Sequence, residues 1–275
     1  MLSRREFLAA SAAALPARTA GLRIGTMDGV LRRSGKPEAI GMAAGFGLAG
    51  VQVTLGRPAA DGRLPLEDAA LQARYLAESK RHGVPIDATY LDILHVNCLK
   101  NDPLARQWVR RGIDITRRLK ARILMTVFFG NCALAGRAEI EYAADVFREL
   151  APEAEKAGVV IGFENLLPAE DNARALDRVA SRAFRIYYDV GNSTNVGGFD
   201  VPREIRWLGR DRICQFHFKD QGYLGEGKVD FPAVLRAVAG IGFEGYANLE
   251  TGAPSGDVAA DLRRNLAYLR GLMRA

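Results

Sequence analysis

Four side chains of types that bind divalent metals each stand at the end of a short apolar segment. The four segments are Ile161–Glu164, Tyr187–Asp189, Gln215–His217 and Ala247–Glu250. Three carboxylates held together would repel one another and raise each other's pKa, a penalty that a divalent cation removes. One imidazole with three carboxylates suits Mn²⁺, Mg²⁺ or Co²⁺, while Zn²⁺ stays open. The sequence therefore predicts a metal site made by Glu164, Asp189, His217 and Glu250.

Each of these residues also has an ordinary explanation when it is taken alone. An acid at a strand end is more often a helix N-cap or a salt-bridge partner. A histidine beside an apolar strand is more often a hydrogen-bonded core residue than a ligand. Four such residues, each with apolar neighbours, are hard to explain separately, because buried acids without partners are costly. The metal site is the better interpretation.

The elements that must position these residues are eight apolar strands alternating with amphipathic helices. Most of the strands are continuous apolar runs, as expected for a parallel sheet covered on both faces. Their spacing fits successive βα units. The predicted strands are Leu22–Thr26, Gly50–Thr54, Pro85–Thr89, Ile123–Phe128, Val159–Glu164, Arg185–Asp189, Ile213–His217 and Tyr246–Glu250.

The helices show an apolar period near 3.6 residues. One stripe runs from Ile140 to Ala154, with Gly158 as the expected helix stop. Another is expected to begin near Asp102 and to bury Leu104 and Trp108.

Eight βα units in about 250 residues predict an α/β protein with a single (β/α)8 TIM barrel. A doubly wound open sheet would need a glycine-rich phosphate turn after its first strand, and Gly25–Gly29 does not match GxGxxG. Chemistry in a TIM barrel lies at the C-terminal ends of the strands, so the four predicted ligands would converge at one mouth.

Composition excludes several other classes of protein. The chain has 275 residues, 48% hydrophobic and 25% charged, with no apolar run of the length that spans a bilayer. Its formal charge is +6, and no basic block with interleaved aromatic residues suggests nucleic-acid binding. The three cysteines, Cys98, Cys132 and Cys214, show no disulfide framework and no CxxC motif, so buried thiols are expected.

Residues 1–20 have the charged start, alanine-rich middle and small residues near the end that are typical of an export signal. Ser3–Leu8 resembles a twin-arginine signal, which is read by a receptor and does not anchor the protein. The alternative is an ordinary first helix. We expect residues 21–275 to form the barrel domain and the mature protein to be periplasmic.

Several of these segments together resemble the xylose-isomerase-like TIM barrels, also called the sugar phosphate isomerase/epimerase family. The resemblance covers about residues 21–275 and rests on the segments 162–165, 188–192, 217–220, 224–231 and 249–251. It implies that Glu164, Asp189, His217 and Glu250 bind one divalent metal ion. By the same resemblance, Glu164 and Glu250 are the catalytic acid–base pair of the ketose 3-epimerase branch.

This pair explains two reactions that proceed through an enediolate. A base on one face of the substrate and an acid on the other invert a carbon, which is epimerisation. A single base that moves a proton between adjacent carbons gives aldose–ketose isomerisation. The chain departs from the 3-epimerase branch at Asn192, where a histidine is usual, and at Tyr223, where an arginine is usual.

A small-molecule carbohydrate is the expected substrate, with no nucleic-acid partner and no stable membrane anchor. Export and the missing phosphate turn favour a free sugar, keto-sugar or cyclitol, and a homo-oligomer stays open. Lys219 either contacts substrate oxygen or pairs with Asp220. The other candidate substrate-binding residues, for which surface or turn roles are alternatives, are Asn192, Asn165, His95, Asn131 and Lys228.

Three rival functions have the same fold. A lyase or dehydratase of the inosose or dehydroshikimate type would use the same metal and expel a leaving group. An exported sugar-binding barrel would need no acid–base pair, which both glutamates argue against. An abasic-site endonuclease needs several metal-binding histidines, and the chain has only three histidines in all.

Overall fold

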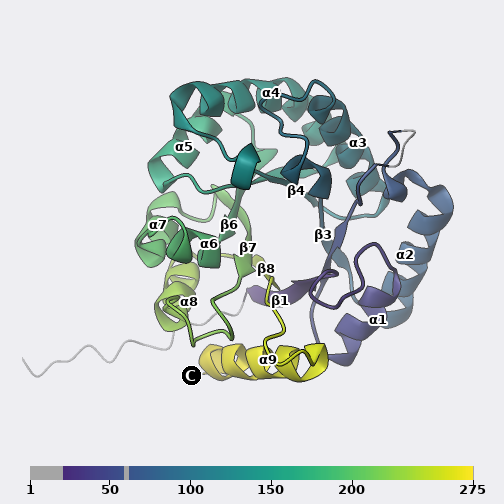
Figure 1. Ribbon diagram of the computed structural model, residues 1–275, viewed down its shortest axis with the longest axis vertical. Coiled ribbons are helices and arrows are strands. Elements are labelled where there is room, and N and C mark those ends of the chain that lie inside the picture. Colours follow the sequence, from purple (N-terminus) through teal and green to yellow (C-terminus); the bar gives the residue numbers. More distant parts are fainter. Residues whose placement is uncertain (1–20, 59–61, 275) are drawn as a thin grey trace, which may run out of the picture.

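The computed structural model describes residues 21–58 and 62–274, which form one closed barrel of eight parallel strands in sequence order. The export signal expected at residues 1–20 lies outside the described residues. Figure 1 shows the strands at the centre and the helices as a ring around them. The strands are β1 Leu22–Met27, β2 Val51–Thr54, β3 Ile86–Tyr90, β4 Ile123–Val127, β5 Val160–Glu164, β6 Phe184–Asp189, β7 Ile213–Phe218 and β8 Gly245–Leu249.

The predicted (β/α)8 barrel is confirmed, and each predicted strand matches an observed one to within one residue at both ends. Strand β8 pairs with β1 from Leu22↔Gly245 to Thr26↔Leu249, which closes the sheet. The helices are α1 Glu38–Gly45, α2 Ala69–His82, α3 Ala105–Arg118, α4 Gly136–Ala157, α5 Ala169–Val179, α6 Val190–Asn195, α7 Val201–Leu208, α8 Phe231–Gly240 and α9 Val258–Arg274.

Local signals in the sequence set several helix ends. Gly158 ends α4 in the left-handed conformation at φ +67°, which a residue with a Cβ adopts at a cost. Asp230 caps α8 by accepting from the backbone N–H of Ala233. The expectation for α3 is wrong at its start: the helix begins at Ala105, so Leu104 precedes it and is exposed.

The main apolar core lies between the barrel wall and the helices. Phe163 of β5 packs edge-on against Phe128 and beside Phe184, and Phe147 of α4 stacks on Phe184. Because side chains alternate along a strand, a Phe163 that points outward sends Glu164 into the barrel. No helix in the described ranges combines the length and apolar character that a membrane span requires.

Two of the three cysteines are joined, which corrects the expectation of buried thiols. Cys98 and Cys132 form a disulfide with their Cα atoms 4.8 Å apart, while Cys214 is free. The two residues follow the neighbouring strands β3 and β4, so the loops that carry them meet at the C-terminal rim of the barrel. Because 34 residues separate the two cysteines in the sequence, no local pattern indicates that they lie close together.

Removing this crosslink should destabilise the protein without changing its fold. We expect Cys98→Ser to lower the free energy of unfolding by about 2–4 kcal/mol, since the closed loop restricts the unfolded chain. Denaturant titration measures the change, and Cys214→Ser is the control. Thiol counting in denaturant should find one free thiol before reduction and three after it; three before reduction would contradict the disulfide.

Candidate metal and active site

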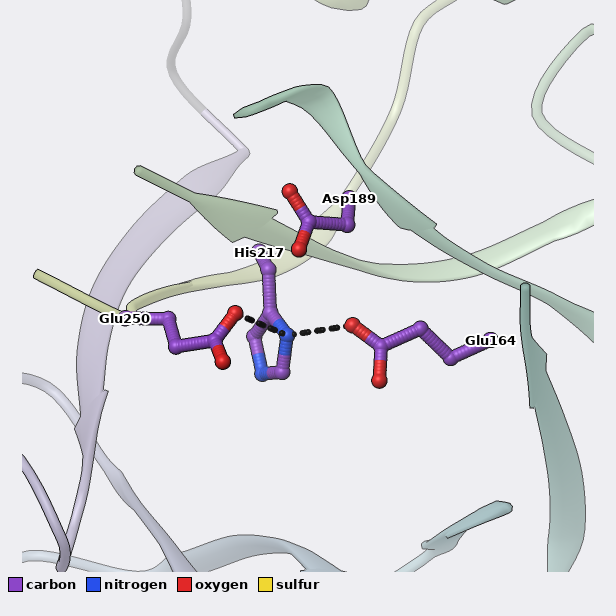
Figure 2. Close-up of side chains that lie close together, drawn as sticks. All are labelled: Glu164, Asp189, His217 and Glu250. Carbon is purple, nitrogen blue, oxygen red and sulfur yellow. Dashed lines mark hydrogen bonds and ion pairs between the residues drawn. The ribbon is translucent and has the colours of Figure 1, made fainter. Parts of the chain in front are cut away.

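Four consecutive strands bring the predicted ligands together at the C-terminal mouth. Glu164 ends β5, Asp189 ends β6, His217 lies near the end of β7, and Glu250 follows β8. One ligand atom from each residue lies within 4.8 Å of the others. Figure 2 shows the carboxylates of Glu164 and Glu250 on opposite sides of the imidazole, with the carboxylate of Asp189 above them in this view. The convergence expected from the strand ends is therefore present.

The imidazole of His217 is the centre of the cluster. Its Nδ1 atom lies 2.7 Å from Glu164 Oε1 and 3.3 Å from Glu250 Oε2. The side chains of His217 and Glu164 are almost fully buried, whereas that of Glu250 is about one-third exposed. Glu250 therefore forms the solvent-facing side of the cluster.

Asp189 fits both explanations that its sequence position allows. Its Oδ1 atom accepts a hydrogen bond of 2.9 Å from the backbone N–H of Asn192 and so caps α6. Its Oδ2 atom is buried and lies 3.0 Å from the ammonium of Lys219. A buried carboxylate is costly unless a positive charge lies beside it, so Asp189 requires a cation at this position.

The donor set therefore fits a divalent cation. Three carboxylates and one imidazole are the ligands that Mg²⁺, Mn²⁺ and Co²⁺ accept, and Zn²⁺ accepts them as well. Glu164, Asp189, His217 and Glu250 would hold the ion.

Burial and charge shift the proton affinities within the cluster. Burial raises the pKa of Asp189 to about 7, and the charge of Glu250 adds to this effect. Burial lowers the pKa of His217, but the carboxylates of Glu164 and Glu250 outweigh it and raise that pKa to about 10. Burial likewise opposes ionisation of Glu250, yet His217 and Lys219 hold its pKa below the ordinary range. In the metal-free chain the imidazole is therefore protonated at neutral pH.

Lys219 is part of this cluster and does not pair with Asp220. Its ammonium lies 2.8 Å from Glu250 Oε2 and 3.0 Å from Asp189 Oδ2. Asp220 instead accepts from the backbone N–H groups of Gln221 and Gly227. The ammonium thus contacts two carboxylates of the cluster.

Gln52 of β2 is a site residue that the sequence analysis missed. Its Oε1 atom lies 2.7 Å from Nε2 of His217, on the side of the ring away from the carboxylates. The available signal was a polar residue within the apolar run Val51–Val53, in a strand where every side chain is buried. Hydrogen bonds of this kind to the second ring nitrogen orient metal-binding histidines.

The other predicted substrate-binding residues differ in their burial and in their contacts. His95 follows β3, stacks on Phe129 and contacts Asp92. Asn165 is buried and engaged in the loop after β5, where it binds Asn172 and the backbone.

Asn192 is half-buried at the start of α6, beside Asp189. Asn131 and Lys228 are exposed. Tyr223, which occupies the position of the usual arginine, donates its hydroxyl to Asp261.

Comparison with known proteins identifies the class. The family model described as xylose isomerase-like TIM barrel matches residues 40–272, so the chain belongs to this family. A curated relative, the 2-epi-5-epi-valiolone 7-phosphate 2-epimerase of an Actinoplanes species, is 30% identical over 203 residues, which are 72% of each protein. The chain is accordingly an enzyme of this family.

Solved structures agree on the fold. D-allulose 3-epimerase from a Methylomonas species superposes with a TM-score of 0.74 at 18% identity, over 91% of this chain and 98% of that one. D-psicose 3-epimerase from Clostridium cellulolyticum, solved with D-tagatose, gives a TM-score of 0.77 at 14% identity, over 91% and 99%. At these identities the likeness concerns the barrel.

Loss of one buried carboxylate should abolish tight metal binding. We expect Asp189→Ala to lower the affinity for Mn²⁺ at least 100-fold, because it removes a ligand and leaves the other charges in place. Isothermal titration calorimetry measures the affinity. The control is Asp230→Asn, which keeps a helix cap on an exposed residue. Equal affinities of Asp189→Ala and the wild type would contradict the site.

Metal binding should release a proton from His217. Because its pKa is raised to about 10, the imidazole is protonated at pH 8 and must lose that proton to coordinate an ion. Affinity should therefore rise with pH, up to about tenfold per unit, until the pH reaches that pKa. Calorimetry at pH 8 in buffers of different ionisation enthalpy should give about one proton per ion; a value of zero would refute this assignment.

Proposed function

We propose that the protein is a divalent-metal-dependent sugar epimerase that acts on a free sugar, keto-sugar or cyclitol. The observation that carries this proposal is the placement of Glu164 and Glu250 on opposite sides of the cluster (Figure 2). A carbon is inverted when one group removes a proton from one face and another returns a proton to the other face. The 2-epimerase activity named for the Actinoplanes relative supports the same reaction class.

Glu164, Glu250 and Lys219 have different roles in the proposed reaction. The carboxylates of Glu164 and Glu250 can each take or give the substrate proton, with Glu164 almost fully buried and Glu250 about one-third exposed to solvent. Lys219 holds its ammonium against Glu250 and can donate to a substrate oxygen. A divalent cation in the cluster would polarise the substrate carbonyl and stabilise the enediolate charge.

Two basic residues at the rim are already paired with an acid, which favours an unphosphorylated substrate. Arg57 and His95, on the loops after β2 and β3, are both engaged by the same carboxylate of Asp92. A phosphate bound there would compete with Asp92 and would be repelled by it. The Actinoplanes relative is named for a 7-phosphate, so the two proteins differ in substrate under this proposal.

We also propose export to the periplasm through the predicted twin-arginine signal in residues 1–20. The Cys98–Cys132 disulfide supports this location, because structural disulfides persist in oxidising compartments. Cell fractionation is the direct test, and recovery of the protein from the cytoplasm alone would contradict export.

Replacing either glutamate by glutamine should remove turnover while leaving the protein folded. We expect Glu164→Gln and Glu250→Gln each to lower kcat about 10²–10⁴-fold, since glutamine cannot exchange the substrate proton. The assay follows deuterium incorporation from deuterated water into free ketoses and cyclitols. The control is Glu244→Gln, an exposed residue at the other end of the barrel, just before β8.

The same assay separates the rival functions. An epimerase yields an inverted sugar that carries deuterium at the inverted carbon, whereas a lyase yields a dehydrated product. A binding protein would show no exchange and would retain its sugar affinity in both glutamine variants. Either of these last two outcomes would refute the proposed reaction.

A further inference from the structure

The interior of the barrel below the site is polar, although TIM barrels usually fill it with branched apolar residues. Gln52, Tyr187, Asn248 and Asp87 all point inward from β2, β6, β8 and β3, and all are buried. Their hydrogen bonds form one continuous series from His217 down to Asp87. None of these four residues belongs to the metal cluster.

The series is defined by four contacts. Nε2 of His217 lies 2.7 Å from Oε1 of Gln52, and the Tyr187 hydroxyl donates to the same oxygen at 3.3 Å. The Asn248 amide donates to the Tyr187 hydroxyl at 3.4 Å and to Oδ1 of Asp87 at 2.8 Å. The contacts at the two ends are short, and the two through Tyr187 are longer.

The donor and acceptor roles in this series follow from Asp87. Its Oδ1 atom accepts from the amides of both Asn248 and Gln215. Its Oδ2 atom has no hydrogen-bond donor, so a proton on this carboxyl group would sit there and leave Oδ1 an acceptor. Asn248 must therefore present its NH₂ group toward Asp87 and Tyr187, whether the carboxyl group is charged or neutral.

The same reasoning assigns the hydrogen-bond donors and acceptors from Tyr187 to the imidazole of His217. The Tyr187 hydroxyl accepts from Asn248 and so donates its hydrogen to Gln52. The NH₂ group of Gln52 donates to the Met125 sulfur at 3.2 Å, and a thioether can only accept. Both contacts hold Oε1 of Gln52 toward His217. The Nε2 atom of His217 must then carry hydrogen.

We propose that Gln52 and Asp87 are positioning residues that set the tautomer of His217, with Nε2–H donating to Gln52 and the Nδ1 lone pair facing the carboxylates. A neutral imidazole has one lone pair, and only Nδ1 lies beside Glu164 and Glu250. The inference rests on the proposed metal site, because the benefit of this tautomer is a ligand atom aimed at the ion.

Two glycines leave the space that this arrangement needs. A Cβ atom on Gly50 would lie 2.3 Å from Oδ2 of Asp87, and one on Gly25 would lie 2.7 Å from it. The Cβ on Gly25 would also lie 2.1 Å from Oδ1 of Asn248. Side chains at these positions would displace Asp87 and Asn248 from their hydrogen bonds.

Two matched substitutions test the proposal by metal affinity. Gln52→Met removes the acceptor for Nε2–H at similar volume, and we expect it to weaken Mn²⁺ binding about 10–100-fold in calorimetry. Gln215→Met is the control: Gln215 is equally buried, donates to Asp87 and lies outside the series to His217. We expect it to change the affinity less than threefold. Equal affinities of the two variants would overturn the proposal.

A spectroscopic measurement reads the tautomer directly. In the Zn²⁺-loaded wild type, ¹⁵N NMR of His217 should show a protonated Nε2 and an Nδ1 without hydrogen. Gln52→Glu, which keeps an acceptor at the same place, should retain this pattern, and Tyr187→Phe should retain it with faster exchange of the Nε2 hydrogen. Hydrogen on Nδ1 in the Zn²⁺-loaded protein would overturn the proposal even if Gln52→Met failed to fold.

The two proposals fail in different ways. A wild-type chain that binds neither Mn²⁺ nor Zn²⁺ would refute the metal site, and the positioning role would fall with it. A wild-type chain that binds metal, with Gln52→Met binding equally well, would refute the positioning role alone.

Discussion

The mutual repulsion of three carboxylates is the constraint on which the architecture of this protein depends. Glu164, Asp189 and Glu250 place their oxygens within a few ångströms of one another in a largely dry environment. Without positive charge nearby, the carboxylates of such a cluster would take up protons and become neutral. In the metal-free chain the compensation is the cationic His217 and the ammonium of Lys219, both in contact with the acids. A divalent cation would supply the same compensation with a fixed geometry.

The barrel supplies the rigidity that holds like charges together. Each predicted ligand lies at the end of its own strand or just beyond it. The apolar residues beside them, such as Phe163, Phe216 and Phe218, pack between the sheet and the helices. Moving one carboxylate away from its neighbours would therefore displace a buried side chain from a close-packed core. The apolar residues beside the ligands thus contribute to the chemistry by fixing the positions from which it acts.

The fold and the convergence of Glu164, Asp189, His217 and Glu250 could be predicted because both depend on short-range patterns. Apolar runs, helix stops such as Gly158 and polar residues at strand ends are all local, and barrel closure follows from their order. The Cys98–Cys132 pair and the His217–Gln52 contact depend on which side chains meet across neighbouring loops or across the barrel, 34 and 165 residues apart. No local pattern reports such distances. Leu104 was wrongly predicted to be buried in the helix, because the apolar period of α3 extends back beyond its first residue, Ala105.

The polar interior of the barrel has a cost in stability that an apolar interior would avoid. Asp87 is buried, its pKa is raised to about 7 by that burial, and one of its oxygens lacks a donor. Replacing Asp87, Gln52 and Asn248 by apolar residues would remove these penalties, as it does for many buried polar groups. An apolar interior would leave Nε2 of His217 without an acceptor, and its proton could then occupy either nitrogen. Under the proposed positioning role, the buried amides cost stability and fix the tautomer of His217, which is useful only where the other ring nitrogen binds a metal ion.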